Sequence, residues 1–316
     1  MLAFGPVPSR RLGRSLGINN IPAKTCSYSC VYCQLGRTVN MTIERQIFYR
    51  PEDIVKEVKM RVSEVLQGNE RIDFLTFVPD GEPTLDINLG RIISALKEIG
   101  VRIAVLTNAS LLWREDVRKD LLEADLASLK IDAVSPGLWR KINRPHKDLK
   151  LNTILEGIVK FTDEFKGTII TETMLIKGLS QCNELRRTAR FIGTLKGLNK
   201  AYLMVPTRPP AESWVKPADE ETINFAFQVF TEELGSDKVE CLTRYEEGTF
   251  TYTGSFEEEL LSITAVHPIS REALVELMEK AKADWSVIDR LLRENKLVEL
   301  EYRGRKYYMR RSLSRN

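Results

Sequence analysis

Apolar segments of strand length alternate with helical or turn-rich stretches along most of the 316-residue chain. The six segments are residues 15–21, 72–78, 101–110, 126–133, 168–176 and 200–207. Between the first two, an amphipathic helix is predicted over 51–66, with a proline in its first turn. Repeated strand–helix units predict parallel strands with right-handed crossovers. The pattern therefore predicts an α/β fold, and periodicity alone leaves open a doubly wound sheet or a partial (β/α) barrel.

The composition is that of a soluble globular protein, with 43% hydrophobic and 29% charged residues. This length suits one large domain, or one large and one small domain. The formal net charge of +3 neither requires nor excludes a polyanionic partner. No apolar run of signal-peptide length opens the chain, and none reaches the roughly 18 residues of a membrane span. We therefore expect a cytoplasmic protein without a membrane partner.

Three of the five cysteines, Cys26, Cys30 and Cys33, lie within the ten residues KTCSYSCVYC. An odd number of cysteines with three clustered thiols is a poor disulfide framework. In a reducing compartment, clustered thiols more often bind a metal or carry out redox chemistry. Thiolates favour zinc, copper(I) or iron–sulfur clusters. The spacing therefore predicts a metal site.

Structural zinc needs a fourth protein ligand, usually from a second Cys or His pair. The chain has no such pair, because His146 and His267 are isolated and Cys182 and Cys241 lie far apart in sequence. A [4Fe–4S] cluster held by three thiolates would instead leave one iron open to a small molecule. Cys182 and Cys241 are expected to be buried free cysteines.

The pattern C-x3-C-x-aromatic-C, with Tyr32 as the aromatic residue, resembles the signature of the radical S-adenosylmethionine (SAM) superfamily. In that family SAM chelates the open iron, and an electron from the cluster cleaves SAM to methionine and a 5′-deoxyadenosyl radical. The resemblance implies that Cys26, Cys30 and Cys33 bind a [4Fe–4S] cluster. It also implies a partial (β/α)6 barrel, and an external electron donor such as flavodoxin or ferredoxin.

The sequence GEPT, Gly81 to Thr84, follows the second predicted strand. It resembles the family's Gly-Gly-Glu-Pro motif, which contacts the amino group of SAM, with Asp80 in place of the first glycine. Gly81 permits close backbone approach, and the Glu82 carboxylate can accept a hydrogen bond from an ammonium group. The resemblance implies that Gly81, Glu82, Pro83 and Thr84 contact SAM, although Gly-Glu-Pro is also a common turn.

Five further residues match family positions near the cofactor. Asn108 and Ser110 follow the third strand in a Thr-Asn turn, which is also ordinary turn chemistry. Lys130 and Asp132 are two residues apart and therefore on one face of a strand. The matching family positions commonly contact the ribose or carboxylate of SAM, and the alternative is a buried ion pair. Glu172 is a cofactor or substrate ligand, or a partner for Lys130.

Loop residues give less specific candidates. Arg144 and His146 lie in KINRPH, and Arg208 lies in a proline-rich segment after the sixth strand. Pro206 and Thr207, just before Arg208, are placed for backbone contacts to the adenine of SAM if the resemblance holds.

Within the superfamily, the chain is most similar to the wyosine-synthase-like branch, whose best known members rebuild a guanine in transfer RNA. The similarity rests on residues 4–19, 141–146 and 206–210. Those enzymes carry a second set of cysteines before the shared motif, whereas no cysteine precedes Cys26. The wyosine reaction itself is therefore not expected.

The resemblance covers about residues 5–245, and we expect residues 1–250 to form the barrel domain. Residues 256–316 resemble a winged helix–turn–helix, with three short helices and a hairpin around residues 303–304. Ser270 and Asp284 are expected at helix starts.

From residue 296 to residue 316, seven Lys or Arg stand against two acidic residues. A basic wing suits a nucleic-acid backbone. Tyr302, Tyr307 and Tyr308 contribute to such a surface or form the packed face of the hairpin.

The predicted function is hydrogen abstraction by a radical SAM enzyme, with RNA as the favoured substrate through base modification of transfer RNA. The alternatives are a protein or peptide substrate, or a small metabolite with a structural C-terminal domain. A DNA-binding redox sensor that uses the cluster as a switch is also left open.

Overall fold

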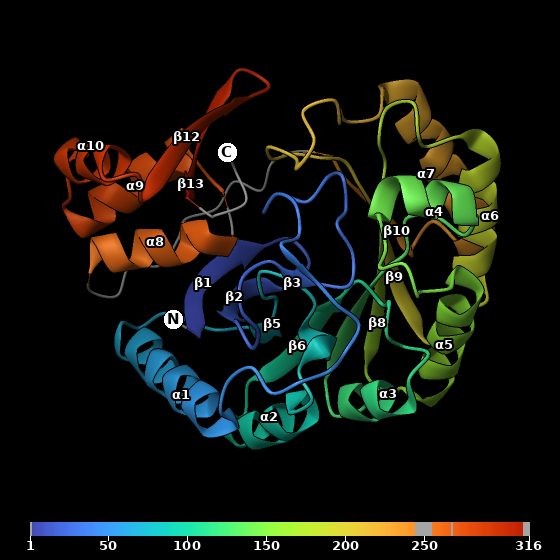
Figure 1. Cartoon of the computed structure of the whole chain (residues 1–316), viewed down its shortest axis with the longest axis horizontal. Coiled ribbons are helices and arrows are strands. Elements are labelled where there is room, and N and C mark those ends of the chain that lie inside the picture. The colour runs from blue at the N-terminus through green and yellow to red at the C-terminus, as the bar shows by residue number, and fades with distance from the viewer. Residues whose placement is uncertain (1, 244–254, 267, 312–316) are drawn as a thin grey trace.

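The computed structural model describes residues 2–243, 255–266 and 268–311. Its main feature is a curved eight-stranded sheet in the order β1-β2-β5-β6-β7-β8-β9-β10 (Figure 1). The strands are β1 (Ala3–Ser9), β2 (Gly13–Ile18), β5 (Phe74–Phe77), β6 (Arg102–Thr107), β7 (Leu126–Lys130), β8 (Thr168–Met174), β9 (Leu198–Met204) and β10 (Val239–Leu242). All neighbours from β2 to β10 are parallel, and β1 pairs antiparallel with β2.

The six expected strands correspond to β2 and β5 to β9. The observed sheet has two strands more than the six that were predicted, because β1 extends one edge and β10 the other. The first of these edge strands comes from a hairpin that precedes the strand–helix alternation, so the periodic pattern did not include it.

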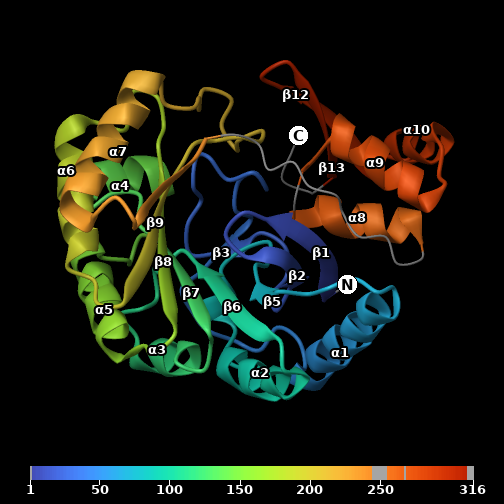
Figure 2. The same cartoon turned by 180° about the vertical axis from the view of Figure 1, so that it is seen from behind.

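Helices cover the convex face of the sheet (Figure 2). They are α1 (Pro51–Gln67), α2 (Leu89–Leu96), α3 (Glu115–Leu121), α5 (Leu151–Glu164), α6 (Cys182–Gly193) and α7 (Glu220–Leu234). The helix expected over 51–66 is confirmed as α1, whose apolar face buries Ile54, Val58 and Val62. In the part of the chain that the structure describes, no helix is long and apolar enough to cross a membrane.

The concave face of the sheet changes from apolar to polar along the strands. Leu126 and Ile170 belong to an apolar cluster inside the sheet. Residues two apart share a face, so Ser128 and Lys130 follow Leu126, and Glu172 follows Ile170, toward the carboxyl ends. Short elements lie beyond these ends: β3 (Thr25–Cys26), β4 (Asn40–Met41), the 3-10 turn η1 (Pro83–Leu85) and α4 (Pro136–Asn143). A second 3-10 turn, η2 (Lys97–Ile99), leads into the amino end of β6.

The C-terminal module, residues 255–266 and 268–311, has its own apolar core. Its elements are α8 (Phe256–Val266), β11 (Ile269–Ser270), α9 (Arg271–Ala281), α10 (Trp285–Arg293), β12 (Leu297–Tyr302) and β13 (Arg305–Arg310). The expected helices, caps and hairpin are present. Ser270 Oγ accepts from Ala273 N at 3.2 Å, and Asp284 Oδ1 accepts from Ser286 N at 2.7 Å. The three strands form an antiparallel sheet in the order β11-β13-β12.

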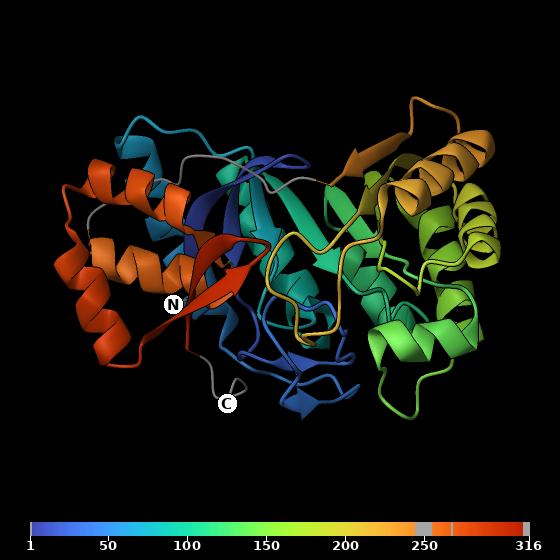
Figure 3. The same ribbon diagram turned by 90° about the horizontal axis from the view of Figure 1, so that it is seen from above.

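The C-terminal module lies beside the β1 edge, and its hairpin reaches toward the loop after β9 (Figure 3). The Tyr302 hydroxyl donates to Pro206 O at 3.0 Å, and the Tyr307 hydroxyl donates to Thr207 O at 3.2 Å. Tyr308 is buried and donates to Glu299 at 2.6 Å within the module. The three tyrosines therefore serve packing, which was the second of the two interpretations of this hairpin.

Candidate active site

The three clustered cysteines lie in one loop beyond the carboxyl end of β2. The loop is anchored at several points, since Thr25–Cys26 pairs with Asn40–Met41, and Val31 N donates to Ile142 O at 2.9 Å. All three cysteine residues are partly buried and free of disulfides. The loop thus presents three sulfur atoms at the edge where the parallel strands end.

Two amide side chains donate toward these sulfurs. Asn108 Nδ2 lies 3.5 Å from Cys26 Sγ, and Asn143 Nδ2 lies 3.4 Å from Cys30 Sγ. Asn108 was predicted from the turn after the third strand. Asn143 was missed, although it stands in the segment KINRPH next to Arg144, which was predicted instead. Hydrogen bonds to cluster-ligating sulfurs are one way in which proteins set a reduction potential.

The environment of Cys26 and Cys30 raises the pKa of both thiols when no metal is bound. Burial raises the pKa of Cys26, and the Glu82 carboxylate raises it further. Burial and the nearby Asp132 carboxylate raise the pKa of Cys30 to about 12. Both thiols are therefore protonated at neutral pH in the metal-free protein. Metal binding must release these protons, so it becomes more favourable as the pH rises.

Within residues 2–243, 255–266 and 268–311, no three Cys, His, Asp or Glu side chains converge as a single metal ion would require. A [4Fe–4S] cluster makes a different demand, because each thiolate binds a different iron. Three thiols on one loop, with amide donors facing two of them, fit such a cluster.

The GEPT segment packs directly against the cysteine loop. A Cβ atom at Gly81 would lie 1.8 Å from Thr25 O, so no other residue fits this backbone position without displacement of the loop. Glu82 N donates to the same carbonyl at 3.1 Å. The close backbone approach that glycine permits is therefore made to the cysteine loop itself.

The Glu82 carboxylate is already occupied by hydrogen bonds from the chain. Its Oε1 accepts from Thr84 N at 3.1 Å and from the Thr84 and Thr107 hydroxyls at 2.6 Å, and its Oε2 accepts from Asn108 N at 2.7 Å. A carboxylate has about four acceptor sites. The expected contact between this carboxylate and an ammonium group would have to replace one of these bonds. In this structure Glu82 instead joins the GEPT segment to the turn after β6.

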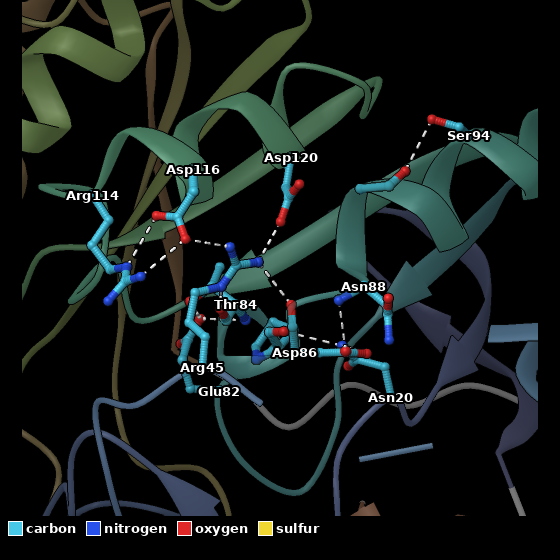
Figure 4. Close-up of polar contacts among 12 residues, drawn as sticks. Asn20, Arg45, Glu82, Thr84, Asp86, Asn88, Ser94, Arg114, Asp116 and Asp120 are labelled. Carbon is cyan, nitrogen blue, oxygen red and sulfur yellow. Dashed lines mark hydrogen bonds and ion pairs between the residues drawn. The ribbon is translucent and has the colours of Figure 1, made fainter. Parts of the chain in front are cut away.

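Arg45 holds the far side of the GEPT segment (Figure 4). Its buried guanidinium donates to Thr84 O at 2.9 Å and to Asp86 O at 2.8 Å. It also pairs with Asp116, at 2.8 Å, and with Asp120 on α3. Sequence reasoning missed Arg45, because it lies in an irregular loop that carries no motif.

Ser110 and Asn108 fasten the turn after β6 to the cysteine loop. Ser110 is fully buried, and its Oγ lies 2.6 Å from Ser27 Oγ. Asn108 Nδ2 donates to the same Ser27 oxygen at 2.9 Å. Both predicted residues therefore lie beside the cysteines.

Glu172 is the centre of a buried ionic cluster on the concave face. It pairs with Lys130 at 3.0 Å, accepts from Ser128 at 2.7 Å, and pairs with Arg11 from the β1–β2 turn. Burial opposes ionisation, but the charges of Arg11 and Lys130 prevail and lower the pKa of Glu172 to about 2. The interpretation of Glu172 as a partner for Lys130 is confirmed, whereas Arg11 was not predicted.

Asp132 and Tyr32 lie next to this cluster. Asp132 accepts from the Tyr32 hydroxyl, from Asn143 Nδ2 at 2.6 Å and from Met174 N at 2.9 Å. Lys130 Nζ lies 5.3 Å from the centre of the Tyr32 ring. The aromatic residue of the cysteine motif is thus joined to the charged strand ends.

The candidates in the loops serve mainly to hold loops together. Arg144 and Arg37 both pair with Glu212, which sequence reasoning missed. His146 N donates to Ser27 O at 2.9 Å, so the KINRPH segment also supports the cysteine loop. The backbone of Pro206 and Thr207 was expected to contact adenine. Their carbonyls instead accept hydrogen bonds from two tyrosine hydroxyls of the C-terminal module.

The two remaining cysteines differ from the expectation of burial. Cys182 is exposed at the start of α6, and Cys241 is partly buried on β10. The first turn of an amphipathic helix can face solvent, which agrees with the polar neighbours of Cys182, Gln181 and Asn183.

A family model for the radical SAM superfamily matches residues 20–192. UPF0026 protein MJ1312 of Methanocaldococcus jannaschii is 49% identical over 316 residues, with 100% of this chain and 98% of the relative covered. Among crystal structures, a radical SAM methyltransferase from Sphaerobacter thermophilus superposes with a TM-score of 0.55 and 16% identity, over 74% of this chain and 67% of its own. A structure of TYW1 with a lysine-pyruvate adduct bound has a TM-score of 0.51 and 15% identity, over 70% and 74%.

The chain therefore belongs to the radical SAM superfamily of enzymes, which confirms the resemblance carried by the cysteine motif. Within the superfamily it belongs to the UPF0026 family. Its cofactors are a [4Fe–4S] cluster and SAM.

Proposed function

We propose that Cys26, Cys30 and Cys33 hold the [4Fe–4S] cluster and leave its fourth iron to the amino and carboxylate groups of SAM. When bound and reduced by an external donor such as flavodoxin or ferredoxin, the cluster supplies the electron that cleaves SAM to methionine and a 5′-deoxyadenosyl radical for hydrogen abstraction. The observation that carries this proposal is the loop of three thiols with Asn108 and Asn143 facing two of them.

The surrounding residues bind and orient the cofactors. The proposed cofactor-binding residues are Tyr32, Gly81, Glu82, Pro83, Thr84, Asn108, Ser110, Lys130, Asp132, Glu172, Pro206 and Thr207. We propose that Glu82 acts by positioning, because its carboxylate fixes two turns against each other. Backbone groups of the GEPT segment then remain to meet the ammonium group of SAM.

The test is anaerobic reconstitution followed by reduction. The protein should bind about four irons and four sulfides and release 5′-deoxyadenosine from SAM. Cys30→Ala should lose both the cluster and SAM cleavage. Cys182→Ala is the matched control, since Cys182 is exposed on α6, and it should keep both. Full iron content and cleavage in Cys30→Ala would refute the ligand assignment.

For the substrate, we propose RNA, modified at a base and held by the C-terminal module as a winged helix–turn–helix over residues 256–316, beside a barrel domain of residues 1–250. Arg303 and Arg305 are exposed at the hairpin tip. Arg303 also lines a 560 Å³ groove together with Val205 and Thr243, which follow β9 and β10. RNA gripped at the tip would therefore lie near the carboxyl ends of the strands. The sequence similarity to the wyosine-synthase-like branch supports this class of substrate.

RNA affinity across a salt series tests this proposal. Charge reversal at Arg303, Arg305 and Lys306 should weaken binding and flatten its salt dependence, by about 0.7 to 0.9 in slope for each phosphate that is no longer neutralised. Charge reversal at Lys119, Arg190 and Lys196, which lie on helices or loops away from the hairpin, is the control and should leave the slope unchanged. Equal slopes for the hairpin variant and the intact protein, or no RNA binding, would refute RNA and favour a peptide or a small metabolite.

A further inference from the structure

A cavity of about 110 Å³ lies on the concave side of the sheet, between the β1–β2 hairpin, the ends of β5 and β6, and the loop after β9. Its polar lining includes Ser9, Arg11, Gln34 and Arg208, and its apolar lining includes Leu12 and Leu106. Among the described residues that line it are two arginines and no carboxylate. The cavity therefore combines apolar walls with positive charge, as a site for a small organic anion would.

The cavity adjoins the proposed cofactor site but is separate from it. Gln34 directly follows Cys33, and Arg11 pairs with Glu172. None of Glu82, Asn108 and Lys130 is among its lining residues. The cavity is therefore placed where the reacting part of a substrate would lie beside SAM.

The polar groups of the cavity favour an anion. A guanidinium presents five N–H donors in a planar fork that matches carboxylate or phosphate oxygens. Arg208 Nη1 donates to Gln34 Oε1 at 3.1 Å, so a neutral side chain orients this fork. Ser9 Oγ is buried and has no hydrogen-bond partner within the described residues, and it can donate to an anion.

We propose that this cavity binds an anionic group of the substrate, a carboxylate or a phosphate, through Arg11 and Arg208. The proposal rests on the proposed radical SAM function, since it specifies the substrate of that same site. It also gives the C-terminal module a second role. Tyr302 and Tyr307 bind the carbonyls of Pro206 and Thr207, the two residues directly before Arg208. The module therefore positions Arg208.

The test uses the cluster-loaded protein with saturating SAM and three probes of similar size: benzoate, phenyl phosphate and neutral benzyl alcohol. Titration calorimetry should show at least one anion binding about tenfold or more tightly than benzyl alcohol, as charge-assisted hydrogen bonds predict. The tighter of the two anions identifies the group as carboxylate or phosphate. Arg208→Gln should abolish the preference for the anion while SAM affinity is kept.

Arg190→Gln is the matched control, because this arginine is exposed on α6 and pairs with Glu233 at the surface. It should bind the probes as the intact protein does. Arg208→Lys keeps the charge without the fork and should bind the anion with intermediate affinity, which tests the proposal even if Arg208→Gln is unstable.

Equal binding of benzyl alcohol and the anions would overturn the proposal, and so would an unchanged preference in Arg208→Gln. Loss of anion binding on addition of SAM would also overturn the proposal, because it would show that SAM itself occupies the cavity. Probe binding does not require SAM cleavage. Anion binding by a protein that fails to cleave SAM would therefore support the cavity and contradict only the proposed function.

Discussion

The region around the cysteine loop and the C-terminal module use their charged and polar groups in opposite ways. Around the cysteines, Glu82, Asp132 and Glu172 are buried and each accepts several hydrogen bonds or ion pairs from other segments. In the module, the buried side chains are mostly apolar, and Arg303 and Arg305 are exposed at the hairpin tip. The difference indicates that polar contacts between segments fix the geometry around the cysteines, whereas the module presents exposed positive charge at its hairpin tip.

Polar contacts join the two regions where they meet. The module contacts the loop after β9 through two tyrosine hydroxyls, and it contacts α1 through Glu259, which accepts from Arg61 at 2.5 and 2.6 Å. The positive charge of Arg310 on β13 also acts on Asp80, next to the GEPT segment. Substitutions around the cysteines and at this junction can therefore separate the roles of the two regions.

The largest effect is expected for Gly81→Ala. The new Cβ would overlap Thr25 O, and backbone atoms cannot move aside as a flexible side chain can. We expect a loss of about 3 kcal/mol in the free energy of unfolding, the upper end of usual overpacking costs. Because the displaced segment is the cysteine loop, iron content after reconstitution should fall as well.

Gly137→Ala is the control for that substitution, since a Cβ at this position on α4 meets nothing within 4 Å. It should unfold like the intact protein or be slightly more stable, because alanine favours helix. Normal stability and iron content in Gly81→Ala would show that the two loops are not packed as described.

Asp80→Asn should have a smaller effect that depends on pH. Burial raises the pKa of Asp80 to about 7, against the opposing charges of Lys24 and Arg310. A carboxyl whose pKa is higher in the folded state contributes stability below its unfolded pKa and loses it as the pH rises through the folded value. The neutral asparagine avoids this loss.

Relative to the intact protein, Asp80→Asn should therefore become more stable between pH 5 and pH 8, by at most about 3 kcal/mol. Urea unfolding of the metal-free protein at both pH values measures the difference. A difference in free energy that does not change with pH would contradict the account of Asp80.

The smallest effect is expected at the tyrosine contacts. Tyr302→Phe and Tyr307→Phe each remove one hydrogen bond to the loop after β9, worth about 0.5 to 1.5 kcal/mol. Hydrogen exchange of the loop over residues 205–212 should become faster in the double variant. Tyr308→Phe loses a bond to Glu299 inside the module, so it should leave exchange in this loop unchanged. If exchange is the same in all variants, the module does not hold the loop.

The sequence predicted the parts of the site that follow from local patterns. Parallel strands end at one edge of a sheet, so motifs that follow successive strands had to lie close together, as Gly81 and Thr25 do. Contacts between irregular loops could not be predicted. Arg45, Asn143 and Glu212 each join segments remote in sequence, and no periodicity or spacing marks them. The sequence drew attention to the carboxylate of Glu82, but its four hydrogen bonds from Thr84, Thr107 and Asn108 became visible only in three dimensions.

We propose that three thiolates hold the cluster and that SAM supplies the remaining ligand. Electron–nuclear double resonance of the reduced, cluster-loaded protein tests it directly, with SAM carrying nitrogen-15 in its amino group or oxygen-17 in its carboxylate. If SAM is this ligand, both labels should show hyperfine coupling to the cluster in the intact protein. A cluster that forms normally but shows no coupling to either label would contradict it.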